Sequence, residues 1–229
     1  MPNGNTLHEV LTAVFQVRKI GECPELCVLL WQRALEPELG AWSLPGGILR
    51  EDEDMTTSAR RQLAEKVDVR EVAHLEQLSV FSDPHRVPDV RLIASTFLGL
   101  VPLGADPVLP PDTAWHPVSA LPRTAFDHGV VVEYARTRLA AKLSYTNIAF
   151  ALAPAEFAMS TLREIYCAAL GYQVDATNLQ RVLGRRGVLV ATGATAPPGR
   201  FGGRPPALYR FAESRLRVTD EFAALRPPS

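Results

Sequence analysis

One stretch of 24 residues, GGILREDEDMTTSARRQLAEKVDV, constrains what this chain can fold into more than any other part of it. It begins with a pair of glycines and passes through an acidic turn. Glu53 follows Gly47 after five intervening residues, and Arg61 follows Glu53 after seven more. Beyond the turn, the segment from Met55 to Val67 predicts a helix. The stretch therefore predicts a glycine pair, an acidic turn and a helix, in that order.

This spacing resembles the Nudix box, G-x5-E-x7-R-E-U-x-E-E-x-G-U, in which U is an aliphatic residue. The preceding WSLPG, residues 42–46, is similar to the way that the family leads into the box. The resemblance implies that the glutamate–arginine pair ties the loop to the helix. Gly46 and Gly47 permit a tight turn and a close approach of a ligand to the backbone. Asp68 replaces the closing glycine, and since aspartate tolerates left-handed geometry the helix can still end there.

In Nudix enzymes, glutamates on this helix hold magnesium ions against a pyrophosphate. The corresponding positions lie one turn apart or adjacent, so their side chains converge on one side of the helix. Here they are Gln62, Glu65 and Lys66. Gln62 offers only a neutral carbonyl, and the ammonium of Lys66 would repel a divalent cation. Because metal-assisted hydrolysis needs the metal to neutralise phosphate charge, we expect no metal site, no catalytic residues and no hydrolase activity.

The charges of the chain are unevenly distributed. Its 229 residues suit one large or two modest domains, and the formal net charge is −1. Residues 1–150 hold 14 basic and 19 acidic residues, whereas residues 151–229 hold 10 basic residues, all arginines, and 6 acidic ones. The positive C-terminal part suggests an anionic partner, nucleic acid first among them. Solvated surface charge is the alternative.

The three cysteines, Cys23, Cys27 and Cys167, lack a matching His or Cys cluster. We therefore expect reduced thiols rather than a disulfide or a zinc site. The sequence also contains no signal peptide and no apolar run long enough to span a bilayer. These features predict a cytoplasmic protein with no membrane partner.

The first part of the chain alternates β-rich runs with a few helical patterns, which predicts an α+β fold. The Nudix resemblance implies a mixed sheet sandwiched by helices. A helical pattern from Asp127 to about Leu143 links this domain, residues 1–148, to a second one, residues 149–229. The strands expected in the first domain are Leu11–Val17, Leu26–Trp31, a short WSLPGG strand, Glu76–Phe81, Arg91–Val101 and Ala114–Val118.

The second part predicts two helices followed by a hairpin with a long tip rich in glycine, proline and arginine. This order describes a winged helix-turn-helix, although two short helices and a hairpin also occur as mere packing. Ser160 and Asp175 are the expected helix caps, and Gly171 ends the first helix. The expected elements are helices Thr161–Leu170 and Ala176–Leu183 and strands Val188–Thr192 and Ala207–Phe211.

Both parts together resemble the NrtR family, the Nudix-related transcriptional regulators of NAD metabolism in bacteria. The resemblance implies a homodimeric repressor that binds palindromic operator DNA and controls genes of NAD synthesis or salvage. It also implies ADP-ribose or a related nucleotide as the effector in the Nudix cleft, with no cofactor required. Beyond the box, the matching residues are Asp127 and His128; Arg138, Leu139 and Lys142; Tyr145 and Thr146; Leu152, Ala153, Pro154 and Phe157; Leu162, Ile165 and Tyr166; Gly203, Arg204 and Pro205; and Leu208 to Phe211.

We expect two sets of site residues. Arginines hold phosphates best, because the guanidinium binds them bidentately, and Trp42 either stacks on a base or packs, with packing favoured. His85 and His128 are expected to be structural. The nucleotide set is Trp42, Gly46, Gly47, Arg50, Glu65, Arg86 and Arg91. The DNA set is Thr177, Asn178, Arg181, Arg185 and Arg186 on the second helix, with Arg200 and Arg204 at the wing tip.

Two other functions are compatible with the sequence. The first is an active ADP-ribose or nucleotide pyrophosphatase with a basic appendage, which requires Glu53 and Glu65 to recruit magnesium with help from outside the box. The second is a protein-interaction module that neither hydrolyses nucleotides nor binds DNA. Gln62 and Lys66 argue against the enzyme, and the C-terminal arginines argue against the interaction module.

Overall fold

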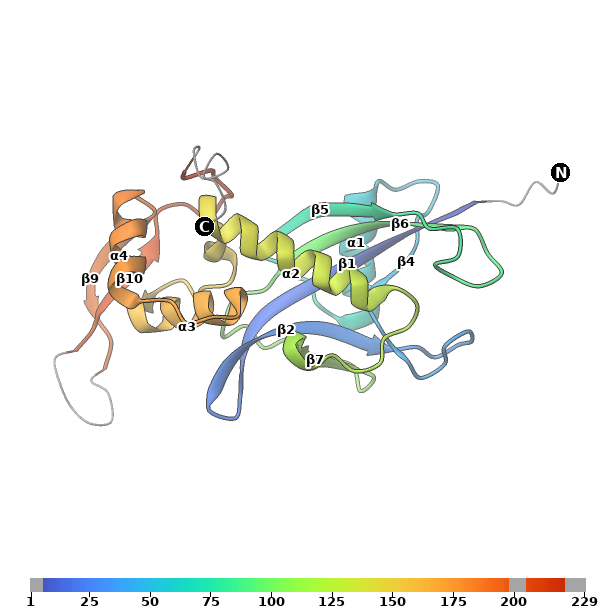
Figure 1. Cartoon of the computed structure of the whole chain (residues 1–229), viewed down its shortest axis with the longest axis horizontal. Coiled ribbons are helices and arrows are strands. Elements are labelled where there is room, and N and C mark those ends of the chain that lie inside the picture. Colours follow the sequence, from blue (N-terminus) through green and yellow to red (C-terminus); the bar gives the residue numbers. More distant parts are fainter. Residues whose placement is uncertain (1–5, 198–204, 221–229) are drawn as a thin grey trace. The chain divides into compact units, whose positions relative to one another are not determined.

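A computed structural model describes residues 6–197 and 205–220 of the chain (Figure 1). These residues form two compact units. The first comprises residues 6–16, 26–101 and 105–137, and the second comprises residues 17–25, 102–104 and 138–220 as far as they are described. The division falls inside helix α2 (His128–Tyr145). The boundary between residues 148 and 149 stays a prediction.

The first unit is built on a mixed seven-stranded sheet of order β3-β2-β1-β6-β5, with β4 paired to β1 and β7 paired to β2. The central strands β1 and β6 run parallel, with Leu11 opposite Thr96, and the strand pairs at β4, β5, β3 and β7 are antiparallel. The α+β class with a mixed sheet is confirmed. The strands are β1 (Leu7–Ile20), β2 (Cys23–Gln32), β3 (Trp42–Ser43), β4 (Gly46–Ile48), β5 (His74–Phe81), β6 (Leu92–Leu100) and β7 (Thr113–Pro117).

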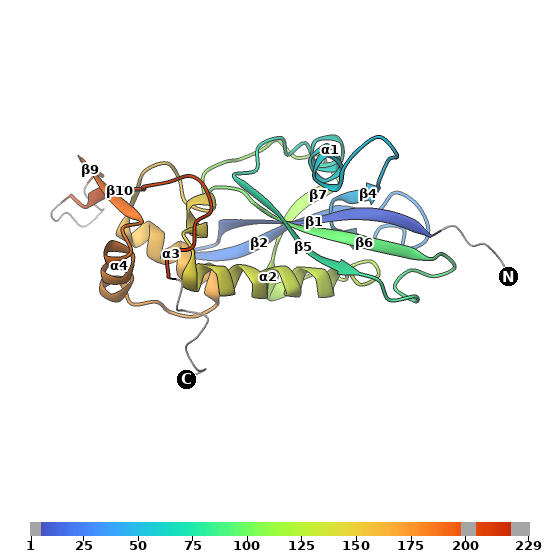
Figure 2. The same ribbon diagram turned by 90° about the horizontal axis from the view of Figure 1, so that it is seen from above.

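Helices cover the two faces of this sheet, with α1 (Met55–Val67) on one side and α2 on the other (Figure 2). Leu63 and Val67 of α1 are buried with Val14 of β1 and Leu29 of β2 in one apolar cluster. On α2 the side chains of Val131, Val132 and Ala135 are fully buried. Each helix thus contributes an apolar face to the core, as a sheet sandwiched by helices requires.

Helix α1 begins and ends at the expected residues. The Asp54 carboxylate accepts the Thr57 amide at 2.8 Å and caps the first turn. Asp68 adopts the expected left-handed conformation, with φ 52°, and its amide is bonded to the Leu63 carbonyl. The predicted bounds of this helix, Met55 to Val67, are therefore confirmed.

The expected tight turn at the glycine pair is wrong. Gly46 and Gly47 lie in β4, opposite Leu11 and Val10 of β1, and neither has a positive φ. Glycine is required there for another reason, namely the close approach of neighbours. A Cβ at Gly46 would collide with β1, and one at Gly47 would lie 2.6 Å from the Gln62 amide.

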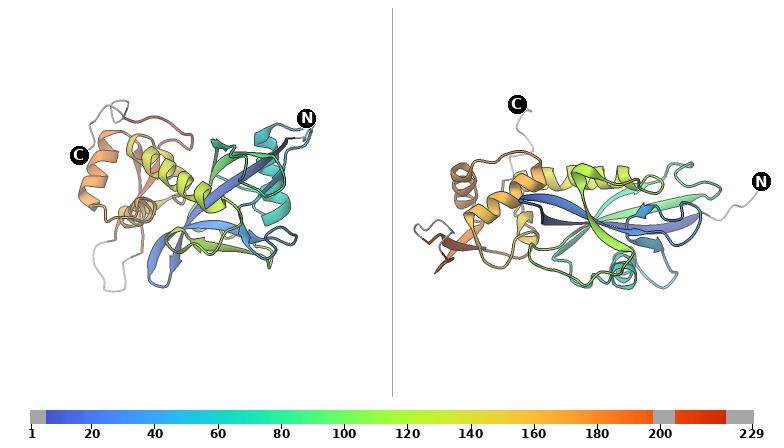
Figure 3. Two further views of the ribbon diagram at one scale, coloured as in Figure 1. Left: turned by 45° about the vertical axis from the view of Figure 1, so that its right-hand side comes forward. Right: turned by 90° about the horizontal axis from the view of Figure 1, so that it is seen from below.

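The second unit contains two helices and a three-stranded sheet of order β8-β10-β9 (Figures 1 and 3). Leu162, Ile165 and Leu183 are buried between these elements, and the rings of Phe157 and Phe211 lie 5.4 Å apart. This arrangement is a winged helix-turn-helix, as expected. Its elements are β8 (Phe157–Ala158), α3 (Met159–Leu170), α4 (Ala176–Arg185), β9 (Leu189–Thr195) and β10 (Ala207–Phe211).

Two details of the second unit differ from expectation. Ser160 lies inside α3, which is preceded by Ala158 with no side-chain cap, because the preceding residues pair with β10 as the unpredicted strand β8. Asp175 does cap α4, accepting the Asn178 amide at 2.7 Å, and Gly171 ends α3 with φ 77°. Capping signals in the sequence do not reveal that strand β8 leads directly into helix α3.

The segment after β10 is held to the end of α2 and to the short 3-10 helix η2 (Ile148–Ala151) that follows. The Asn147 side chain donates to the Arg215 carbonyl at 2.9 Å and accepts the Arg217 amide at 2.7 Å. The Thr219 amide donates to the Tyr145 carbonyl at 2.7 Å. A second 3-10 helix, η1 (Val118–Ala120), follows β7. No helix within residues 6–197 and 205–220 is long and apolar enough to cross a membrane.

Candidate ligand-binding site and nucleic-acid interface

In the Nudix box, an ion pair joins the acidic loop to α1. Arg61 donates to both oxygens of Glu53, at 2.8 and 2.5 Å, and the Arg50 amide donates to the same carboxylate at 2.9 Å. The hydrogen bonds from Arg61 above all lower the pKa of Glu53 to about 2. Glu53 therefore ties the loop to the helix and is charged at neutral pH.

Gln62 occupies a buried structural position on α1, with only 4% of its surface exposed. With its amide oriented so that both ends are satisfied, the nitrogen donates to the Gly46 carbonyl at 3.2 Å and the oxygen accepts from Arg61. Glu65 accepts from Arg61 at 3.1 Å and lies 3.7 Å from Arg50. Both side chains therefore stabilise the box internally.

The magnesium that a Nudix fold implies does not fit these residues. Mg²⁺ prefers carboxylate oxygens and waters in octahedral array. Among the residues that the structure describes, no group of three or more His, Cys, Asp or Glu side chains is placed to hold a metal. Glu53 and Glu65 are both engaged by Arg61, and the remaining two helical positions offer an amide and an ammonium.

Lys66 points at an aromatic ring. Its ammonium lies 4.4 Å from the centroid of Trp31 on β2, and the Trp31 indole is held by a hydrogen bond of 3.1 Å to the Leu44 carbonyl. Burial first, and then the nearby positive charge of Arg33, lower the pKa of Lys66. A cation thus stands where the family places a metal-binding carboxylate.

Arg86 is the most deeply buried of the arginines expected to bind nucleotide, with 1% of its side chain exposed. It donates to Glu9 at 2.5 Å and to both oxygens of Asp127, at 2.9 and 2.8 Å. Burial raises the pKa of Glu9 and outweighs the hydrogen bond from Arg86. The Arg86 guanidinium is thus satisfied by two carboxylates within the Nudix domain, and its phosphate contact stays a prediction.

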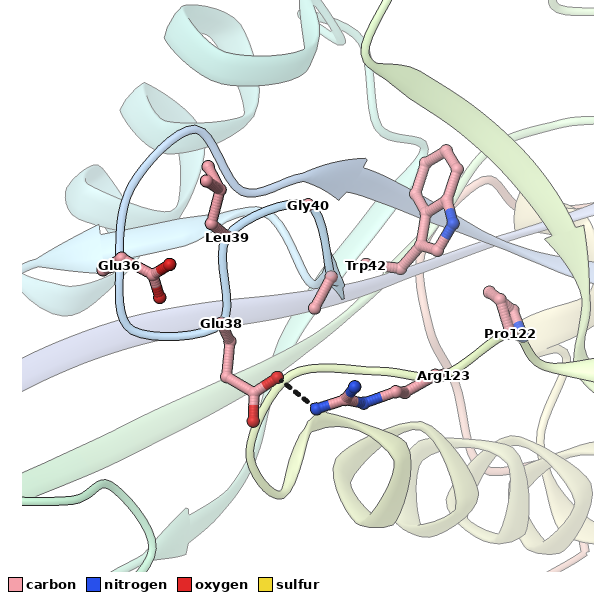
Figure 4. Close-up of a pocket in the computed structure, with 8 residues that line it drawn as sticks. Glu36, Glu38, Leu39, Gly40, Trp42, Pro122 and Arg123 are labelled. Atoms are coloured by element: carbon pink, nitrogen blue, oxygen red, sulfur yellow. Dashed lines mark hydrogen bonds and ion pairs between the residues drawn. The ribbon is translucent and has the colours of Figure 1, made fainter.

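Arg91, Arg50 and Trp42, three further residues of the nucleotide set, lie in different surroundings. Arg91 donates to the Ser82 carbonyl at 2.8 Å, and Arg50 is exposed. Trp42 meets His116 edge-on, with ring centroids 4.2 Å apart, so the favoured packing role describes it well. Its side chain also borders a pocket of about 670 Å³ that includes the Arg123–Glu38 ion pair of 2.9 Å (Figure 4).

A second pocket, of about 590 Å³, borders the Arg86 cluster. Glu38 lines this pocket as well as the first one. The other residues that line the second pocket are Asp83, His85, Arg86, Pro88, Phe126, Asp127 and Val130. The volumes of both pockets lie in the range of small-molecule binding sites.

His128 is buried and structural, as expected. Its Nδ1 accepts the Leu44 amide at 3.0 Å, which holds the chain between β3 and β4 to the start of α2. Burial lowers the pKa of His128 to about 4, so the ring is neutral at physiological pH. His85 is exposed and its amide is bonded to Asp83 at 2.7 Å.

Helix α4 presents polar side chains to solvent. Thr177, Asn178, Arg181 and Arg185 are exposed, whereas Leu179 and Leu183 are buried. Arg181 donates to Asn178 at 2.7 Å along the exposed face. Their DNA contacts stay predictions, and Arg200 and Arg204 lie outside the described residues.

Arg186, at the end of α4, differs from the other members of the DNA set. Its guanidinium donates to Asp220 at 2.8 Å, and the two side chains are 12% and 14% exposed. The structure therefore places Arg186 in an internal ion pair within the second unit, with its guanidinium engaged. The pairing links the C-terminal cap of α4 to the segment that runs back to Tyr145.

Comparison with known proteins decides the family. The sequence profile of the NUDIX domain matches residues 9–134, more than half of the chain. The chain belongs to the Nudix family. Residues 149–211 match a second profile, described as the NrtR DNA-binding winged helix domain. The order of a Nudix domain followed by a winged helix domain, expected from the sequence, is thereby confirmed.

Individual relatives are similar to one or both parts of the chain. The ADPR responsive transcriptional repressor NtrR of Acinetobacter baylyi is 29% identical over 195 residues, which cover 82% of this chain and 76% of the relative. NrtR of Shewanella oneidensis, crystallised with a 27mer DNA, is similar with a TM-score of 0.75 and 27% identity over 89% of this chain and 92% of that one. The Nudix domain of the same protein, crystallised with ADP ribose, matches 59% of this chain and 89% of that one, with 31% identity and a TM-score of 0.50.

Sequence reasoning missed four groups in the Nudix domain. Glu9 and Asp127 satisfy Arg86, and Trp31 and Arg33 surround Lys66. Only the position of Lys66 within the box signals its importance in the sequence. The others lie on β1, β2, the following loop and the start of α2, so only the fold brings them together.

Proposed function

We propose that this chain is a transcriptional repressor whose Nudix domain binds ADP-ribose, or a related nucleotide, without hydrolysing it. The observation that carries the proposal is the box itself, in which Gln62 is a buried structural amide and Lys66 lies on Trp31. This box is joined in one chain to a winged helix of the NrtR type. A Nudix domain that binds a diphosphate but lacks a metal site is suited to sensing rather than turnover.

The exposed polar face of α4 supports the DNA-binding half of the proposal. A recognition helix reads base edges in the major groove through such side chains. A single winged helix buries too little DNA for tight operator binding, whereas a dimer doubles the contacts and imposes twofold symmetry. We therefore propose a cytoplasmic homodimer, held by the Nudix domains and α2, that binds an imperfect palindrome controlling genes of NAD synthesis or salvage.

Binding linkage tests this control. If ADP-ribose favours an arrangement that does not bind DNA, it lowers DNA affinity by about 1–3 kcal/mol. Operator DNA must then weaken ADP-ribose binding by the same factor. Gel shifts against the promoter region of neighbouring genes, with and without ADP-ribose, give the first value, and calorimetry at matched salt gives the second. Equal ADP-ribose affinity with and without operator would rule out ADP-ribose control.

Hydrolysis assays test the competing enzyme function. We expect no magnesium-dependent ADP-ribose hydrolysis approaching ordinary enzyme rates of about 1 s⁻¹ or more. The double variant Gln62→Glu with Lys66→Glu restores two carboxylates and is expected to recover magnesium binding, measured by calorimetry. Turnover by the wild type at ordinary rates would favour the pyrophosphatase reading instead.

A further inference from the structure

Two cations of the Nudix domain have no carboxylate ion-pair partner among the described residues: Lys66, which lies over Trp31, and Arg33, two residues after Trp31 in the chain. Lys66 and Arg33 form no ion pair with any residue in the described ranges, 6–197 and 205–220. Both are half-buried. Glu9 and Glu65, the acidic groups whose charges raise the pKa of Lys66, are already engaged by Arg86 and Arg61.

Aromatic rings and one carbonyl hold these two side chains in place. The Lys66 ammonium lies 4.4 Å from the Trp31 ring centroid, and the Arg33 guanidinium lies 4.9 Å from the Phe126 ring centroid. Arg33 also donates from Nε to the Pro37 carbonyl at 2.9 Å, which leaves both terminal nitrogens of the guanidinium available. A cation–π contact offsets only about 0.5–2 kcal/mol of the cost of such a position.

The two charges also repel each other. After burial, Arg33 is the strongest influence that lowers the pKa of Lys66. Partly buried charges are normally paired, because desolvation without a partner is costly. Two cations that lack an ion-pair partner of their own therefore describe a site for an anion, and a diphosphate supplies two negative charges. The guanidinium suits a bidentate phosphate contact, and the ammonium acts as a point charge.

We propose that Lys66 and Arg33 form the diphosphate-binding site of the nucleotide effector, and that Lys66 supplies the positive charge that magnesium supplies in metal-dependent Nudix enzymes. This inference rests on the proposed function and deepens it. It makes effector binding independent of divalent metal. It also moves the phosphate site from Arg50, Arg86 and Arg91, the arginines expected from the sequence, to the pair beside Trp31.

Calorimetry with full-length protein tests the site. Wild type should bind ADP-ribose with the same affinity in EDTA and in magnesium. Lys66→Met keeps the apolar stem against Trp31 but removes the charge, and Arg33→Met does the same beside Phe126. Each should weaken metal-free binding by about tenfold to a hundredfold, the contribution of a charge-assisted hydrogen bond. Lys66→Arg should restore most of the affinity.

Arg60→Met is the matched control, because Arg60 is an exposed arginine on the same helix as Lys66. It removes one positive charge and should leave ADP-ribose affinity unchanged. Melting curves of all variants separate loss of binding from loss of folding. If Lys66→Met does not fold, Arg33→Met and Lys66→Arg still decide the question.

The outcomes separate this inference from the proposed function. ADP-ribose binding that requires magnesium, or that is unchanged in both Met variants, would overturn the site even if ADP-ribose still releases DNA. Metal-free, Lys66-dependent binding without any effect on DNA would support the site and contradict the proposed control. Should ADP-ribose not bind, inorganic pyrophosphate is the probe: binding that Lys66→Met weakens supports the anion site, and no binding overturns it.

Discussion

Arg61 and Arg86 of the Nudix domain differ from Arg181 and Arg185 of helix α4 in whether their charges are paired. In the Nudix domain, Arg61 and Arg86 are each satisfied by two carboxylates of the same unit. On α4, Arg181 and Arg185 remain exposed, and neither forms an ion pair with a described residue. Internally satisfied charges stabilise a fold, whereas exposed and unpaired ones are available to a partner. Substitutions of Arg61 and Arg86 should therefore affect stability, and substitutions of Arg181 and Arg185 should affect binding.

The largest expected effect belongs to Arg86. Arg86→Met leaves Glu9 and Asp127 facing each other without a cation, and removing one partner of a buried ion pair costs on the order of 3–5 kcal/mol. Urea titration should show this loss in the free energy of unfolding. The same substitution at exposed Arg181 should change stability by less than about 0.5 kcal/mol. Similar losses for both variants would erase the contrast between the two regions.

Acid should destabilise the Nudix domain through His128. Its pKa is about 4 when folded and 6.5 in the reference state, so the unfolded chain binds the proton first. Stability from this group is complete above about pH 6.5 and is lost progressively as the pH falls towards 4, by roughly 3 kcal/mol in all. His128→Gln should remove this part of the pH dependence. His85→Gln, at an exposed position, should retain it.

On α4, the expected loss is in DNA binding rather than in folding. Arg181→Ala should weaken operator binding by about 1–3 kcal/mol and relax sequence preference if Arg181 reads a base. Arg60→Ala removes an equal charge from the Nudix domain and should leave the gel shift unchanged. An unchanged gel shift for Arg181→Ala as well would move the DNA surface away from this part of α4.

Arg186, at the end of α4, is the exception, because its charge is paired within the second unit. We expect the smallest effect on stability here. Asp220→Ala breaks its ion pair, in which both side chains are mostly buried, and should lower the free energy of unfolding by about 1–2 kcal/mol. Glu213→Ala breaks the pair with Arg217, whose side chains are about half exposed, and should cost about 0.5 kcal/mol or less. Equal effects in chemical denaturation would mean that Arg186 is not held internally.

Local signals in the sequence predicted much of the fold. Asp68 ends α1, and Asp175 and Gly171 mark the turn between α3 and α4, because capping depends on residues within one helical turn. Strand β10 was predicted with its observed bounds. Strand β8 was missed, since its two residues pair with β10 about fifty positions later.

For the candidate site as well, the sequence determined some features and the tertiary structure determined others. The sequence alone determined that the Nudix box lacks two of its carboxylates, because Gln62 and Lys66 stand at fixed positions within one helix. Only the tertiary structure decided which charges are satisfied. Arg86 bonds to Glu9, 77 residues away in the chain, and to Asp127, 41 residues away, and Lys66 of helix α1 contacts Trp31 of strand β2. A guanidinium looks the same in the sequence whether it is paired or free, and pairing depends on the neighbours that the fold brings within hydrogen-bonding distance.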